Sequence, residues 1–155
     1  MSTRRELLQR SATLAALMAA AGVLPGIARA EAAGYAKAAF EAKSMAELTK
    51  ALGLATPVES RDVAIQGPDI AENGAVVPLG ASTTLPGVKR LMLLVEKNPA
   101  MLTAMFDIGE HIDAAVSTRA KMAQSSNVYA VAVMNDGRVL YAAKEVKVTL
   151  GGCGG

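Results

Sequence analysis

The chain has 155 residues, a length typical of one domain; 52% of the residues are hydrophobic and only 3% are aromatic. It has a formal net charge of +2, one cysteine and one histidine. A nucleic-acid-binding protein is disfavoured because there is no basic patch or aromatic platform, and a zinc or iron–sulfur site is disfavoured because a single Cys and a single His are too few ligands.

Residues 1–30 have the pattern of a twin-arginine export signal. Arg4 and Arg5 precede an uncharged run over residues 11–28, and Ala28-Arg29-Ala30 is an A-x-A cleavage site. A membrane-spanning anchor is the alternative, since the uncharged run approaches the ~18 residues that a span requires. The run is rich in alanine and only weakly apolar, so we expect cleavage after Ala30 and a periplasmic location.

Cleavage changes the charge of the chain. Residues 1–30 contain four of the 16 basic residues and one of the 14 acidic residues, so 12 basic and 13 acidic residues remain. The exported chain is therefore close to neutral, which again does not favour nucleic acid, and no membrane association is expected after cleavage. The twin-arginine route carries folded cargo, and this makes a folded partner plausible.

The region that follows the signal begins with one expected helix. Residues 33–52 are rich in Ala, Lys, Glu, Leu and Met, which are good helix formers, and their apolar residues approximate one face. Gly53 then ends the helix as a C-terminal glycine does. We expect this helix to cover an apolar surface elsewhere in the domain.

From Val58 onward, short β-prone runs alternate with turn residues. The runs are 58–66, 75–79, 88–95, 101–108, 112–117, 119–123, 127–134, 138–143 and 145–150. Asn135-Asp136-Gly137 predicts a tight primed hairpin turn, and Pro78 and Pro99 are expected at strand edges or ends. About seven or eight strands at this spacing predict an all-β, antiparallel β-sandwich. The apolar block 91–95 is either core or a surface that packs on another chain.

The body of the chain contains no recognisable active site. There is no glycine-rich phosphate loop and no G-x-S-x-G motif, and Asp69, Asp107 and Asp113 form no acid–base pair in the sequence. His111 is a candidate base, but a surface or strand-end histidine is the better interpretation.

The C-terminal tail is the strongest functional signal. Gly151, Gly152, Gly154 and Gly155 flank Cys153, the single cysteine, which therefore has no intramolecular disulfide partner. At about 3.3–3.6 Å per residue the cysteine reaches roughly 10 Å past Leu150, on a slim segment that fits a narrow channel.

The thiol of Cys153 is poorly arranged to catalyse. At an unperturbed pKa near ~8.5 only a few per cent is ionised at neutral pH. Lys144 and Lys147 are the nearest cations in the sequence, and a solvated arm does not hold the sulfur beside them. We expect a carrier arm that other active sites act on; an incidental glycine tail is the alternative.

The run 146–155, behind a twin-arginine signal and an all-β domain, resembles the SoxY family of sulfur-substrate carriers in bacterial thiosulfate oxidation. The resemblance implies an immunoglobulin-like sandwich and a SoxZ partner in a heterodimer. It also implies that thiosulfate is joined to Cys153 by the haem enzyme SoxAX, that SoxB hydrolyses off sulfate, and that SoxCD, where present, oxidises the remaining sulfur. The chain itself would be a carrier without a cofactor.

These observations divide the chain into a signal (1–30), a helix plus β-sandwich (31–150) and a flexible carrier arm (151–155). Two other functions stay open. A ubiquitin-like sulfur carrier would use the carboxylate of Gly155, although the export signal and the number of strands argue against it. A structural protein would use Cys153 for an intermolecular disulfide that locks a homodimer.

Overall fold

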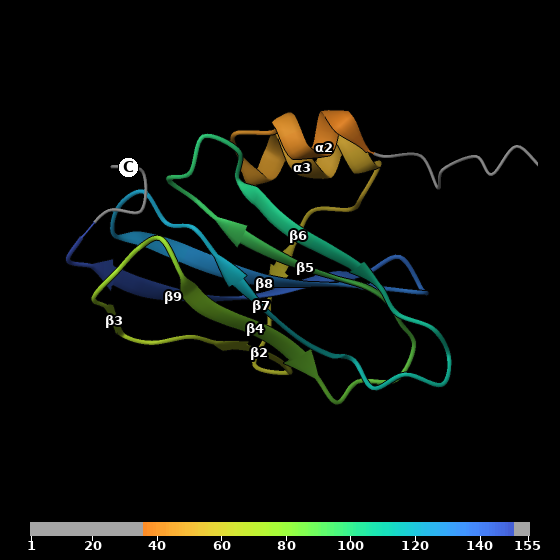
Figure 1. Cartoon of the computed structure of the whole chain (residues 1–155). Helices are drawn as coiled ribbons and strands as arrows, with labels where there is room; N and C mark the ends of the chain where they lie inside the picture. Colours follow the sequence, from red (N-terminus) through yellow and green to blue (C-terminus); the bar gives the residue numbers. More distant parts are fainter. Residues whose placement is uncertain (1–35, 151–155) are drawn as a thin grey trace, which may run out of the picture. The chain divides into compact units, whose positions relative to one another are not determined.

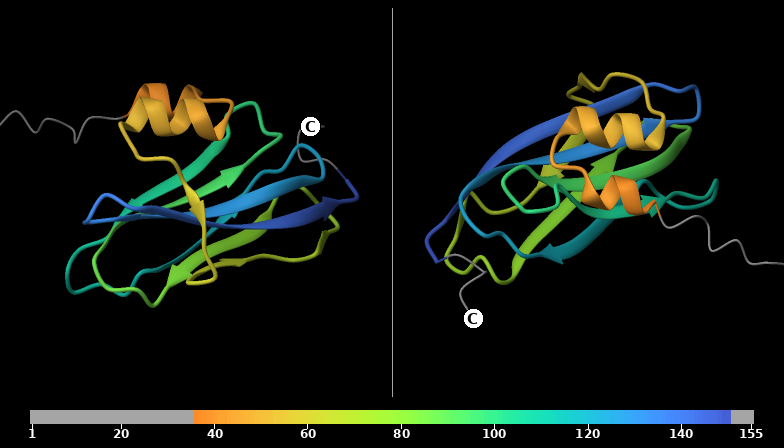
Figure 2. Two further views of the ribbon diagram at one scale, coloured as in Figure 1. Left: turned by 180° about the vertical axis from the view of Figure 1, so that it is seen from behind. Right: turned by 90° about the horizontal axis from the view of Figure 1, so that it is seen from above.

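The computed structural model describes residues 36–150. They form three layers: two short helices, a six-stranded sheet and a three-stranded sheet (Figures 1 and 2). The elements are α2 (Lys37–Glu41), α3 (Met45–Leu52), β1 (Val58–Glu59), β2 (Val63–Gln66), β3 (Ile70–Ala71), β4 (Val77–Thr83), β5 (Val88–Val95), β6 (Leu102–Asp107), β7 (Ala115–Ala120), β8 (Ser126–Met134) and β9 (Val139–Val148). The predicted all-β, immunoglobulin-like sandwich is confirmed.

The large sheet has the order β1-β9-β8-β5-β6, with β3 also paired to β9, and the small sheet has the order β2-β4-β7. All pairings are antiparallel except those of β1 and β3, which lie parallel to β9. Within the described residues, β9 is therefore hydrogen-bonded to three other strands. This matters for function, because β9 is the strand that leads into the C-terminal tail.

Strands β5 and β8 are buried on both faces. Leu91, Leu93 and Val95 of β5 face the small sheet, whereas Met92 and Leu94 face the helices. A strand that is covered on both faces needs an apolar residue at every position, and this explains the uninterrupted apolar block 91–95. All five of its residues are buried, so the core interpretation is correct and the interface interpretation is wrong.

The prediction of one helix is wrong, because the helical region breaks at residues 42–44. Ala42 is extended (ψ 134°), and Ser44 then caps a new helix: its side chain accepts a hydrogen bond from the Glu47 N–H (3.2 Å). The Glu47 carboxylate in turn accepts from the Lys43 N–H (2.8 Å). Gly53 ends α3 in the left-handed conformation (φ 63°), as predicted.

Several strand boundaries also differ from the prediction. The run 58–66 divides into β1 and β2, which belong to different sheets, whereas 138–143 and 145–150 merge into the continuous β9. The runs 112–117 and 119–123 likewise contribute to the single strand β7.

The β8–β9 hairpin is present, but its turn is not of the primed type. Among residues 36–150 no residue except glycine has a positive φ, and in this turn only Gly137 does (φ 89°). The Gly137 N–H donates to the Met134 carbonyl (3.1 Å) and the Met134 N–H donates to the Arg138 carbonyl (2.9 Å). This is the three-residue loop in which an ordinary turn is followed by a left-handed glycine.

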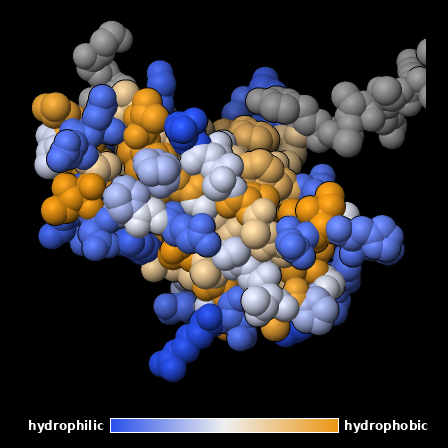
Figure 3. Space-filling view, turned by 60° about the horizontal axis from the view of Figure 1, so that its bottom comes forward, coloured by the Kyte–Doolittle hydropathy of each residue, from blue (hydrophilic) through white to orange (hydrophobic). Residues whose placement is uncertain are grey.

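The predicted proline positions hold in part. Pro99 lies between β5 and β6, whereas Pro78 lies inside the central strand of the small sheet. There it pairs with Arg119 of β7 and lies beyond the end of β2, so its missing N–H breaks no ladder. The outer face of this sheet carries mainly residues of intermediate hydropathy, with strongly polar residues around it (Figure 3).

Candidate functional site: the root of the carrier arm

The predicted carrier arm, Gly151, Gly152, Cys153, Gly154 and Gly155, lies outside the described residues, as do Arg4, Arg5 and the rest of the predicted signal. The structure describes where the arm starts. We call residues 147–150 the arm root. Their contacts decide how the domain presents whatever follows Leu150.

One flank of the arm root is held by the segment that includes β3. Three backbone hydrogen bonds join them: Lys147 N–H to Asp69 C=O (2.9 Å), Thr149 N–H to Ala71 C=O (3.1 Å) and Gly74 N–H to Leu150 C=O (2.7 Å). The Thr149 hydroxyl adds a fourth bond, to the Glu72 carbonyl (2.9 Å). The pairing therefore continues past the last strand residue, Val148, as far as Leu150.

The other flank is held by one side chain. The Ser125 hydroxyl accepts a hydrogen bond from the Val148 N–H (2.9 Å) and donates a longer one to the Val148 carbonyl (3.4 Å). Ser125 precedes β8, so its hydroxyl continues the β8–β9 ladder where the two backbones separate. The arm root is thus bound on both sides, and its backbone pairing continues to Leu150, the last residue that the structure describes.

Lys144 ties β9 to the segment before β3. Its ammonium donates to the Gly67 carbonyl (2.6 Å) and lies 2.8 Å from a carboxylate oxygen of Asp69. The hydrogen bond that the Asp69 carboxylate accepts from Lys144, together with the positive charge of Lys144, lowers the pKa of the Asp69 carboxyl below its ordinary value. Lys144 therefore binds the segment that pairs with the arm root, whereas Lys147, three residues further along β9, is exposed.

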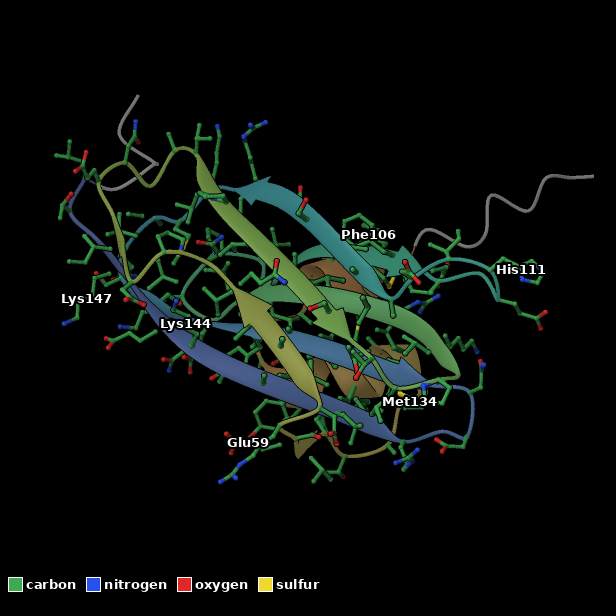
Figure 4. The ribbon with its side chains drawn as sticks, turned by 90° about the horizontal axis from the view of Figure 1, so that it is seen from below. Glu59, Phe106, His111, Met134, Lys144 and Lys147 are labelled. Carbon is green, nitrogen blue, oxygen red and sulfur yellow. The ribbon has the colours of Figure 1, made fainter. Side chains whose placement is uncertain are left out.

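The other candidate residues do not gather at the arm root. His111 is exposed in the β6–β7 loop, and Figure 4 shows it at the opposite end of the domain from Lys147. Asp107 pairs with Arg90 (2.6 Å) on neighbouring strands, and Asp113 is exposed in the same loop as His111. In residues 36–150 no group of three or more His, Cys, Asp or Glu side chains is placed to hold a metal ion.

A wide hollow also lies away from the arm root. Its volume is about 1040 Å³, and it is lined by the β4–β5 and β6–β7 loops and by Asn135 of the β8–β9 hairpin. The hairpin and the arm root are at opposite ends of the ten-residue β9, which spans about 33 Å. No described helix is long and apolar enough to cross a membrane.

Sequence reasoning identified the tail but missed the residues that hold its base. Ser125, Gly74 and Ala71 are distant from the tail along the chain, and nothing local marks them as its partners. One signal was available at the arm root itself: Val146, Val148 and Leu150 alternate, which places them on one face of β9.

Comparison with known proteins agrees with this arrangement. The family model described as "Sulfur oxidation protein SoxY" matches residues 48–153, from α3 to the cysteine of the tail. The solved structure of the sulfur carrier protein SoxY from Chlorobium limicola f thiosulfatophilum is 33% identical, covers 66% of this chain and 93% of its own, and superposes with a TM-score of 0.60. No curated protein sequence gave a match.

A superoxide reductase (neelaredoxin) from Ignicoccus hospitalis is 18% identical, covers 57% of this chain and 80% of its own, and has a TM-score of 0.51. This likeness concerns the fold alone. The match to the family model, in contrast, runs from the middle of α3 through both sheets to the cysteine of the tail, and it agrees with the 33% identity to the solved relative. The chain belongs to the SoxY family of sulfur oxidation proteins.

Proposed function

We propose that this chain is a periplasmic carrier that holds sulfur covalently on Cys153 and presents it to the enzymes of thiosulfate oxidation. The observation that carries the proposal is the extent of the family match, which continues through the sheets to Cys153 itself. The arm root supports it, because the β3 side binds it as far as Leu150 and the Ser125 side binds it at Val148, next to the predicted arm. A fixed base and a short glycine segment are what a carrier of bound substrate needs.

The chemistry proposed for the thiol has two steps. In the first, the Cys153 thiol and thiosulfate lose one proton and two electrons, and a bond forms between the cysteine sulfur and the outer sulfur of thiosulfate. The electrons pass to the haem enzyme SoxAX. In the second, SoxB adds water across the sulfur–sulfonate bond, so that sulfate and a proton leave and a persulfide stays on Cys153.

The carrier itself is proposed to contribute no catalytic group. A thiol at its unperturbed pKa is mostly protonated at neutral pH. Of the two nearest cations in the sequence, Lys144 is bound to Asp69 and Gly67 and Lys147 is exposed, and His111 lies at the far end of the domain. Activation of the thiol is therefore assigned to the active sites that the arm enters.

Export and partner assignments complete the proposal. Arg4 and Arg5 begin a twin-arginine signal (1–30), residues 31–150 form the folded carrier domain and 151–155 form the arm. A route for folded cargo suits a chain that leaves the cytoplasm bound to a second subunit, and SoxZ is proposed as that subunit. SoxAX, SoxB and, where present, SoxCD would bind transiently.

Intact-mass spectrometry tests the proposal. The chain with its partner subunit is incubated with thiosulfate and the loading enzyme, and then with the hydrolase. We expect the mass to rise by one thiosulfate group and then to fall until one added sulfur atom remains. Cys153→Ser should show neither change. Sulfur adducts that persist in Cys153→Ser would instead support the carboxylate of Gly155 as the attachment point.

The disulfide alternative is separated by a different measurement. If the cysteine locks a homodimer, non-reducing electrophoresis of cell extracts shows mainly an oxidised dimer, and Cys153→Ala leaves thiosulfate oxidation intact. The carrier proposal requires the opposite: a monomeric thiol or sulfur adduct, and loss of thiosulfate oxidation in Cys153→Ala.

A further inference from the structure

The short arm limits how far an active site can be from the domain. The Cys153 sulfur is three residues past Leu150, and a fully extended chain covers only about 3.3–3.6 Å per residue. The thiol therefore reaches about 10 Å beyond the arm root, plus the length of its side chain. Any enzyme that takes this sulfur into a channel must bring the mouth of the channel against the surface around Leu150.

That surface is apolar. Among residues 36–150 five large hydrophobic side chains are exposed, and three of them lie in the arm root or in the segment that pairs with it: Leu150 (69% exposed), Ile70 (59%) and Val76 (56%). Ile70 is next to Ala71, whose carbonyl binds Thr149, and Val76 is two residues past Gly74, whose N–H binds Leu150. We call Ile70, Val76 and Leu150 the collar.

The collar is not an incidental part of the core. Exposure rises along the chain at the end of β9: Val146 is buried, Val148 is half-buried, and Leu150, two residues past the end of the strand, is exposed. Within the described part of the chain, Leu150 is hydrogen-bonded through its backbone carbonyl, so this pairing does not depend on an apolar side chain at position 150. Uncovered aliphatic side chains that cluster at one point of a surface are typical of an interaction site.

We propose that the collar is the contact surface for the mouth of the active-site channel that receives the arm, and that this mouth is lined by apolar side chains. The inference rests on the proposed carrier function. Three aliphatic side chains bury little area, and small interfaces belong to transient encounters. A weak apolar contact suits a carrier that must dock at one enzyme, leave it and dock at the next.

Matched substitutions test the collar. Ile70→Ser, Val76→Ser and Leu150→Ser are combined in one variant. The control combines Val58→Ser and Ile112→Ser, whose side chains are equally exposed (61% and 64%). Val58 pairs near the hairpin end of β9, and Ile112 lines the hollow at that same end. Both control residues are therefore remote from the arm root.

Three measurements are made on the full chain with its partner subunit: kcat/KM for enzymatic transfer of thiosulfate to Cys153, the rate of Cys153 alkylation by a small maleimide, and the molar mass by light scattering. We expect kcat/KM of the collar variant to fall at least about tenfold, which corresponds to ~1.4 kcal/mol. Alkylation and molar mass should not change, and the control variant should load normally.

Each other result overturns the inference. Normal loading of the collar variant would mean that the enzyme does not touch the collar. A change in molar mass would assign the collar to a second protein chain, and slower alkylation would mean that the substitutions disturb the arm itself. Failure of the carrier function is recognised separately, because the unsubstituted chain would then gain no adduct on Cys153.

Discussion

Removing the Ser125 hydroxyl should loosen the arm root while the rest of the domain keeps its fold. In Ser125→Ala the Val148 N–H loses its acceptor at 2.9 Å, and the Val148 carbonyl loses a weak donor at 3.4 Å. An unsatisfied buried donor costs about 1–3 kcal/mol. Both residues are half-buried, so water replaces part of the bond, and we expect a loss of about 1–1.5 kcal/mol in the free energy of unfolding.

Urea denaturation measures this loss as a lower midpoint at an unchanged slope. Amide hydrogen exchange adds the local readout: the Val148 amide should exchange about tenfold faster, because 1.4 kcal/mol is a factor of ten. Thr149→Val is the control, since it removes an exposed hydroxyl that donates to the Glu72 carbonyl and should cost less than ~0.5 kcal/mol. Equal losses in the two variants, or unchanged exchange at Val148, would refute the assignment of Ser125 as the tie.

The other predictions concern the core, the ion pair and the arm. Leu93→Ala, in the strand buried on both faces, should cost about 2–5 kcal/mol in urea denaturation, and a loss below ~1 kcal/mol would contradict the packing described here. Because Lys144 lowers the pKa of the Asp69 carboxyl, their ion pair stabilises the fold at pH values above the ordinary carboxyl pKa. This stabilisation is lost as the pH falls through the lowered pKa of Asp69. Lys144→Gln should therefore flatten the decline of the melting temperature below about pH 4, and an unchanged decline would exclude this pair as its source. Gly151→Val with Gly152→Val should slow enzymatic loading about tenfold or more without changing the melting temperature, and unchanged loading would show that a slim arm is not required.

The sequence was most informative where structure depends on near neighbours. Strand β5 was predicted with its observed bounds, because its apolar run is uninterrupted, and the β8–β9 hairpin was predicted from Asp136-Gly137. The break between α2 and α3 also had a local signal, since Ser44 is followed three residues later by Glu47, the spacing of a capping box. The residues on both sides of this break are good helix formers, and they led to the prediction of one continuous helix.

Pairing between distant segments could not be predicted in the same way. Strands β1 and β3 contain two residues each and exist only because β9 offers them a parallel partner. The run 58–66 is divided between two sheets for the same reason, since residues 58–59 pair with β9 and residues 63–66 pair with β4. The arm illustrates the difference most clearly: its cysteine and glycines are visible in the sequence, whereas the serine and backbone groups that fix its base come from segments far along the chain.

The point at which the pairing of β9 ends has two consequences at once. If the arm root were unpaired back to Val146, the free segment would gain four residues, or about 13 Å of reach, and Cys153 could enter an active site without the domain touching its mouth. With the root bound up to Leu150, the thiol can reach a buried site only when the collar meets the enzyme. The hydrogen bonds of Ser125 and Gly74 therefore set both the length of the arm and the surface that must dock. On the proposed carrier function, substitutions at the arm root should accordingly alter which enzymes can load Cys153, although no residue of the arm root is proposed to take part in the sulfur chemistry.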